Sequence, residues 1–219
     1  MTTTNPRPAP SVLQPDDRTG WRNTDVFAAV NAALFCFMCG TVYYDRFVTY
    51  RGAGNLHEFF FYAAAILTAI GLGAYFLRRL HWPTWLLIVV QAGIIAHFCG
   101  AFIPIDGGRL YDAHILGVRY DKYVHAFNAF AGASIVAHLL SRDNAHLPAK
   151  PAVILLTVLG GGAIVEILEY LVTLTVKHSG VGDYDNNMQD LISNLVGASA
   201  YVIYLDLRRR LYRWRHPKP

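Results

Sequence analysis

Apolar residues gather in six blocks of roughly 20 residues, without the alternation that is typical of half-buried strands. A helix needs about 20 apolar residues to cross a bilayer, whereas a transmembrane barrel would show alternating segments of about ten residues. The pattern therefore predicts an all-α fold, a polytopic transmembrane helical bundle of six spans. The predicted spans are residues 25–45, 58–77, 83–104, 122–141, 151–176 and 190–207.

Composition supports a membrane protein and disfavours a soluble enzyme. Of the 219 residues, 54% are hydrophobic and 16% are charged, and the mean hydropathy is +0.29. A soluble domain is about 25% charged. Residues 1–24 are polar and rich in Pro and Thr, so we expect a disordered tail without the apolar core of a signal peptide. Residues 25–207 then form the transmembrane domain, and residues 208–219 form a basic tail.

The distribution of Lys and Arg predicts the orientation. With the N-terminus inside, 13 basic residues fall on inner segments and 6 on outer segments. Because cytoplasmic segments carry an excess of Lys and Arg, we expect both termini to be cytoplasmic. The formal charge of +4 does not indicate nucleic-acid binding, since the run Arg208–Arg210 and Trp214 are typical of an anchor at the lipid headgroups.

Polar residues recur at helical spacing in the last three spans. Asp121 and His125 are four residues apart, and Glu166 and Glu169 are three apart, so each pair shares one helix face. A third stripe consists of Asn187, Asp190 and Asn194. In the predicted topology all three stripes lie toward the outer side, as does His97 near the end of the third span. We expect them to converge on one pocket that opens outward.

Glu166 is the member of this set that is hardest to explain as a purely structural residue. Counting back from Lys177 at about 1.5 Å per residue places it roughly 16 Å into the membrane. An ionisable group at that depth costs about 2.5–3.5 kcal/mol on insertion scales. Its side chain is too short to reach the surface, so it must meet a His, a cation, a proton or a metal from another helix.

The motifs in this half of the chain resemble those of a known family. Tyr120-Asp121-Lys122-x-x-His125 is followed by Glu166-x-x-Glu169-Tyr170 and then by Asp190-x-x-x-Asn194-x-x-Gly197-Ala198. This order resembles the YjdF-like bacterial inner-membrane proteins and is more distantly similar to VanZ-like proteins. The resemblance covers about residues 118–200, with Tyr170 where the family pattern often has Trp. It implies location in the bacterial inner membrane and a role facing the cell envelope, without an assigned reaction.

Three functions fit these residues, and the sequence alone does not decide whether the chain is an enzyme. The first is a site for a divalent metal (zinc, iron or manganese) that acts on a lipid or envelope substrate. Its candidate ligands are His125, Glu166, Glu169 and Asp190. Glu166 and Asp121 are the candidate catalytic residues, Asp121 as the group that orients His125. Asn187, Asn194 and His97 are further candidates for the wall of the site.

The second function is a proton-coupled transporter in which Glu166 titrates, with a homodimer supplying the symmetry that the sequence lacks. The third is a non-catalytic membrane partner or immunity-type protein in which the polar cluster holds helices together. All three place the chain in the lipid bilayer, and none involves nucleic acid.

Overall fold

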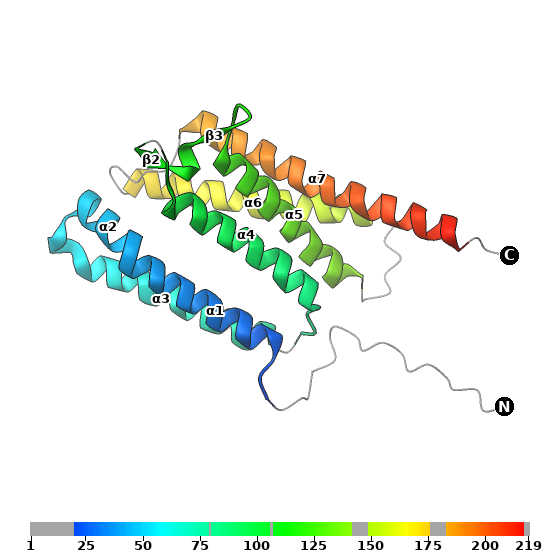
Figure 1. The fold of residues 1–219 in the computed structure, drawn as a ribbon, viewed down its shortest axis with the longest axis horizontal. Helices are drawn as coiled ribbons and strands as arrows, with labels where there is room; N and C mark the ends of the chain where they lie inside the picture. Colours follow the sequence, from blue (N-terminus) through cyan, green and yellow to red (C-terminus); the bar gives the residue numbers. More distant parts are fainter. Residues whose placement is uncertain (1–19, 79, 106, 142–148, 176–182, 217–219) are drawn as a thin grey trace.

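The computed structural model describes residues 20–78, 80–105, 107–141, 149–175 and 183–216. Long helices run side by side across the length of the molecule (Figure 1). They are α1 (Asn23–Met38), continued by a π-helical turn (Cys39–Tyr43) into α2 (Tyr44–Arg51); α3 (Leu56–Leu77); α4 (Thr84–Phe102); α5 (Tyr120–Leu140); α6 (Lys150–Thr175); and α7 (Tyr184–Arg215). A short 3-10 turn, Ala53–Asn55, precedes α3.

Five of these helical segments are long and apolar enough to cross a membrane. They are Asn23–Thr49, Ala53–Leu77, Thr84–Phe102, Tyr120–Leu140 and Lys150–Leu171. The sixth predicted span, 190–207, lies within α7, which is 32 residues long and is not one of the five. Its first turns carry Asp185 and Asp190, and its last turns carry five arginines from Arg208 to Arg215. The chain is thus a helical membrane protein, and six spans remain a prediction.

Three of the sequence predictions fall partly or wholly beyond the described residues. The disordered tail is one of them, because residues 1–19 are not described and α1 already begins at Asn23. Lys177, the reference for the depth of Glu166, is another. The basic tail is described to His216, and α7 continues through its arginines to Arg215, so this part is helical.

The connection from α4 to α5 contains two small antiparallel hairpins that the sequence pattern did not predict. Strand β1 (Pro104–Ile105) pairs with β2 (Gly108–Arg109), and β3 (His114–Ile115) pairs with β4 (Val118–Arg119). A 3-10 turn, Leu110–Asp112, joins them. Strands of two residues are too short to show a period-2 pattern. They matter because β4 leads directly into α5 and its polar first turn.

Small residues bring α5, α6 and α7 into close contact. Their shared core consists of Ala133, Ala137, Ile154, Ala198 and Tyr201. A Cβ added to Gly197 would overlap the backbone carbonyl oxygen of Ala126, so α7 touches the main chain of α5. Close backbone approach at small residues is the usual way in which membrane helices associate. This contact fixes the polar turns of α5 and α7 opposite each other.

Helices α1 and α3 form a separate pair beside α4 (Figure 1). A two-way amide contact joins α1 to α4: Asn31 Nδ2 donates to Gln91 Oε1 at 2.8 Å, and Gln91 Nε2 donates to Asn31 Oδ1 at 3.2 Å. Each described residue of α3 is at least partly exposed. The polar residues that the sequence analysis selected all lie on α4 to α7.

The beginning of α1 and the end of α7 lie at the same end of the bundle (Figure 1). The end of α3 lies there too, because Arg22 Nη1 donates to the carbonyl oxygen of Arg78 at 2.6 Å. His138, near the end of α5, contacts the carbonyl oxygen of His81 at 3.2 Å. The two hairpins, the first turn of α5 and the first turn of α7 occupy the opposite end, where the polar cluster is found.

Candidate functional site

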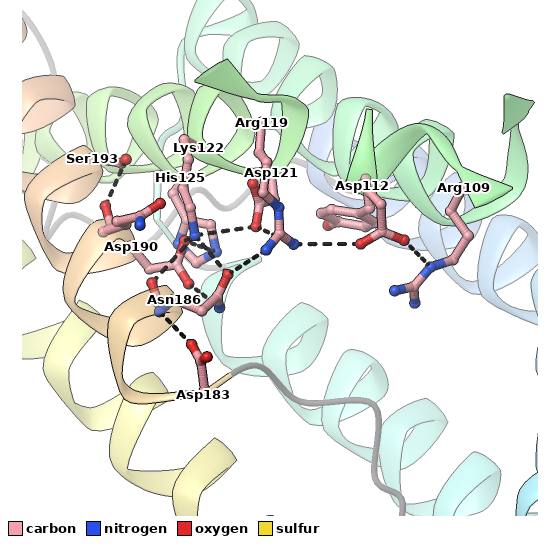
Figure 2. A network of polar contacts seen from close by, with 12 residues as sticks. Arg109, Asp112, Arg119, Asp121, Lys122, His125, Asp183, Asn186, Asp190 and Ser193 are labelled. Atoms are coloured by element: carbon pink, nitrogen blue, oxygen red, sulfur yellow. Dashed lines mark hydrogen bonds and ion pairs between the residues drawn. The ribbon is translucent and has the colours of Figure 1, made fainter. Parts of the chain in front are cut away.

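The carboxylate of Asp190 lies at the centre of the polar cluster, in the second turn of α7 (Figure 2). Its side chain is almost completely buried, with 2% exposure. Oδ1 accepts a hydrogen bond from Lys122 Nζ at 2.7 Å and lies 3.4 Å from His125 Nε2. Oδ2 accepts one from Asn186 Nδ2 at 2.8 Å. Both oxygens are thus engaged by donors from α5 and α7.

The first turn of α7 is fixed by its own capping residue. Asp183 is the N-cap, and its Oδ1 accepts a hydrogen bond from the backbone N–H of Asn186 at 3.0 Å. An acidic cap satisfies a free N–H group and is favoured by the helix dipole. The cap places Asn186 and Asp190, four residues apart, on the face that contacts α5.

Lys122 is the cation at the centre of the cluster. It is 5% exposed, and its Nζ contacts Asp190 Oδ1, Asp121 Oδ2 at 3.2 Å, and both the side-chain and backbone oxygens of Asn186 at 2.8 and 3.2 Å. A buried ammonium is tolerated only when such acceptors surround it. Lys122 therefore joins two carboxylates and an amide into one network.

A chain of ion pairs continues from this network to the surface (Figure 2). Arg119 Nη2 lies 3.0 Å from Asp121 Oδ2 and 3.4 Å from Asp112, and Arg119 Nη1 donates to Asn186 at 3.0 Å. Arg109 Nε then pairs with Asp112 at 2.8 Å. Two cations, Arg119 and Lys122, thus balance two buried acids, Asp121 and Asp190. No cation of this network is left to neutralise Glu166.

Glu166 on α6 projects toward the same point as His125 and Asp190. One ligand atom of each of these three residues lies within 4.8 Å of the others. Glu166 is 5% exposed, and both of its carboxylate oxygens are buried with no hydrogen-bond partner among the described residues. A buried carboxylate without donors is costly unless it is protonated or binds a cation. The geometry can hold a metal ion with one imidazole and two carboxylates.

A cavity of about 510 Å³ lies beside this triad, between α4, α5, α6 and α7. Its polar wall consists of His97, His125, Asn128, Thr157, Glu166, Glu169 and Asn194, and the rest is Val, Ile, Ala and Gly. Gly161 and Gly162 belong to this wall. A Cβ on Gly162 would lie 2.7 Å from Asn194 Nδ2, so glycine there makes room for the Asn194 side chain. The cavity is therefore amphipathic, and two members of the triad, His125 and Glu166, stand on its polar wall.

The structure brings together most of the residues that the sequence analysis selected. His125, Glu166 and Asp190 form the triad, while His97, Glu169 and Asn194 line the adjoining cavity. Asn187 is half-buried, and its Oδ1 has no partner among the described residues. Within the described part of the chain Asp121 contacts Arg119 and Lys122, not His125. The expectation that Asp121 orients His125 therefore has no corresponding contact.

The sequence analysis assigned no role in the site to three residues of this network, Lys122, Arg119 and Asn186. Lys122 appeared only in the motif Tyr120-Asp121-Lys122-x-x-His125 and, with Arg119, among the six basic residues of the predicted outer segments. The available signal was Lys122 itself, a cation that directly follows Asp121 at the start of a predicted span. A Lys at a span boundary usually reaches the headgroups, which is why its burial could not be foreseen.

The sequence profile of a family described as "Predicted membrane protein (DUF2238)" matches residues 47–210, and the chain belongs to this family. The matched region includes every member of the triad and of the ion-pair chain. No curated protein and no solved structure matches the chain.

Proposed function

We propose that this member of the family is a multi-pass protein of the bacterial inner membrane that binds a divalent metal ion at His125, Glu166 and Asp190. The observation that carries the proposal is the triad itself. Three helices each contribute one ligand atom, and these atoms lie within 4.8 Å of one another. Glu166 supplies two buried oxygens without a donor among the described residues. A metal ion would provide the missing positive charge.

The ligand set favours zinc, iron or manganese. Imidazole suits zinc and iron, while carboxylates also suit manganese. Three protein ligands leave one position open, which is the arrangement of catalytic zinc sites. When bound, such an ion supplies Lewis acidity and activates water. In this proposal Glu169, on the same cavity wall, accepts the proton of that water.

The substrate class follows from the cavity. Its wall is mainly apolar and includes His125 and Glu166 of the triad, so it suits an amphiphile whose polar part reaches the triad. A lipid or a lipid-linked envelope molecule has this character. The positive-inside asymmetry and the similarity to YjdF-like and VanZ-like motifs support a site that faces the envelope, with both termini cytoplasmic and six spans. Cysteine labelling of spheroplasts tests the orientation, and metal analysis separately tests the metal site.

The decisive experiment is elemental analysis of protein purified in detergent. We expect close to one zinc, iron or manganese ion per wild-type chain and near-complete loss of that ion in Glu166→Gln. The matched control is Glu169→Gln, which changes an acid on the same cavity wall that is not part of the triad. Wild-type protein without stoichiometric metal, even after incubation with zinc, would exclude the metal site.

A non-catalytic role for the cluster is the second candidate, and the ion-pair network favours it. The contacts of Lys122 with Asp190 and of Arg119 with Asn186 join α5 to α7 without any metal. Under this candidate the double variant His125→Ala/Glu166→Gln retains full biological function. Loss of function in this variant, with normal folding, favours the metal site.

A further inference from the structure

His97 and Tyr111 form a hydrogen-bonded pair at the cavity, outside the triad and outside the ion-pair network. The hydroxyl of Tyr111 contacts Nδ1 of His97, and their rings meet edge to face with centroids 5.4 Å apart. His97 comes from α4 and lines the cavity, whereas Tyr111 belongs to the 3-10 turn between the hairpins. The connection between α4 and α5 thus reaches back to a residue of the cavity wall.

The Tyr111 ring is held firmly in its place. A Cβ on Gly100 would lie 2.9 Å from this ring, so the ring packs directly on the backbone of α4. On its other side it meets Tyr120 edge to face, with ring centroids 6.3 Å apart. Gly100 permits the approach because a larger residue would displace the ring. The hydroxyl is consequently fixed relative to His97.

The Tyr111 hydroxyl can donate to Nδ1 or accept from it, and donation is favoured because it gives the hydroxyl proton an acceptor. Burial raises the pKa of Tyr111 above its ordinary value, so the hydroxyl keeps its proton. Among the described residues, the structure shows that hydroxyl in hydrogen-bond contact with Nδ1 of His97. A neutral imidazole has one donor nitrogen and one acceptor nitrogen. If Tyr111 donates to Nδ1, the ring proton must lie on Nε2.

We propose that Tyr111 is a positioning residue that fixes His97 as the Nε2–H tautomer and so provides a neutral hydrogen-bond donor at the cavity wall. With Nδ1 engaged, Nε2 is the ring nitrogen available to a ligand, and it binds an acceptor oxygen such as a carbonyl or phosphoryl oxygen. The ligand itself rests on the proposed function, whereas the tautomer does not. His97 is then a ligand-binding residue and not a fourth metal ligand.

Nitrogen NMR tests the tautomer directly. The protein is labelled with ¹⁵N-histidine in lipid nanodiscs without metal, and His97 is assigned among the nine histidines by loss of its signals in His97→Gln. We expect separate signals for a protonated Nε2 and an unprotonated Nδ1 at neutral pH. In Tyr111→Phe, which keeps the ring on Gly100, these signals should move toward the average of two exchanging tautomers.

The matched control is Tyr123→Phe. Like Tyr111→Phe, this variant removes one tyrosine hydroxyl at the same end of the bundle. The hydroxyl of Tyr123 donates a hydrogen bond to the carbonyl oxygen of Ile115 at 2.8 Å. We expect its His97 signals to match the wild type. If Tyr111→Phe does not fold, the wild-type spectrum alone decides. A charged ring, a tautomer mixture in wild-type protein, or unchanged His97 signals in folded Tyr111→Phe would overturn the proposal.

Zinc analysis separates this inference from the metal site. Tyr111→Phe should bind as much zinc as the wild type, because neither Tyr111 nor His97 belongs to the triad. Loss of zinc in this variant would overturn the assignment, since the pair would then serve the metal. Wild-type protein that binds no zinc but shows the Nε2–H tautomer would refute the metal site and leave the positioning role of Tyr111 standing.

Discussion

Lys122 Nζ lies 2.7 Å from Asp190 Oδ1, and this buried ion pair joins the first turn of α5 to the second turn of α7. The pair has a direct consequence for the candidate metal centre. Asp190 is already neutralised by Lys122, and Asp121 is neutralised by Arg119 and Lys122. Glu166 is therefore the carboxylate of the triad that no cation of this network neutralises.

The first prediction concerns this ion pair. Lys122→Met leaves Asp190 buried without its cation, and removing one partner of a buried pair costs about 3–5 kcal/mol of unfolding free energy. The double variant Lys122→Met/Asp190→Leu should lose less unfolding free energy than Lys122→Met alone, because no unpaired carboxylate remains at position 190. Chemical unfolding in detergent measures both. The control is Arg210→Ala, which breaks an exposed pair with Asp206 and should cost less than about 1 kcal/mol.

The second prediction concerns metal and stability together. A ligand that binds only the folded protein at 100 times its Kd stabilises it by about 2.7 kcal/mol. Zinc should therefore raise the Tm of the wild type, and a chelator should reverse the rise. Glu166→Gln should show no zinc response, although without zinc it should differ from the wild type by less than about 1 kcal/mol because Gln is nearly isosteric. Equal zinc responses in both proteins would contradict the role of Glu166.

A third prediction uses two glycines that differ in their surroundings. The Cβ of Gly197→Ala would overlap the backbone carbonyl of Ala126, which cannot move independently, so α7 must shift away from α5. Overpacking of this kind costs about 1–3 kcal/mol. Since Asp190 is on the same helix, bound zinc should fall as well. Gly160→Ala is the control, because apart from its own stretch of helix no described atom lies within 4 Å of the added Cβ. It should keep both stability and zinc.

The fourth prediction concerns topology. In a background without Cys36, Cys39 and Cys99, single cysteines at His114 and His216 mark opposite ends of the bundle. Both positions are exposed. A membrane-impermeant thiol reagent applied to spheroplasts should label His114→Cys and spare His216→Cys until the membrane is permeabilised. Labelling of His216→Cys in intact spheroplasts would contradict a cytoplasmic C-terminus.

The sequence by itself determined that the chain is a helical membrane protein, approximately where most of its long apolar helices lie, and which of their residues are polar. Apolar blocks predicted helices close to the observed α3, α4, α5 and α6, because a bilayer imposes both length and composition on any segment that crosses it. Helical spacing also predicted that Glu166 and Glu169 share a face and that Asp190 and Asn194 share another. These properties are local, so they can be read from neighbouring residues.

Only the tertiary structure decided how these faces meet. Asp121 was expected to serve His125, yet Asp121 pairs with Lys122 and Arg119, while Asp190 from another helix lies beside the His125 ring. The hairpins that bring Tyr111 to His97 were equally invisible in the sequence pattern. The physical reason is that such contacts depend on the rotation and separation of packed helices. These are fixed by a few small residues such as Gly197, whose partner is distant in the sequence.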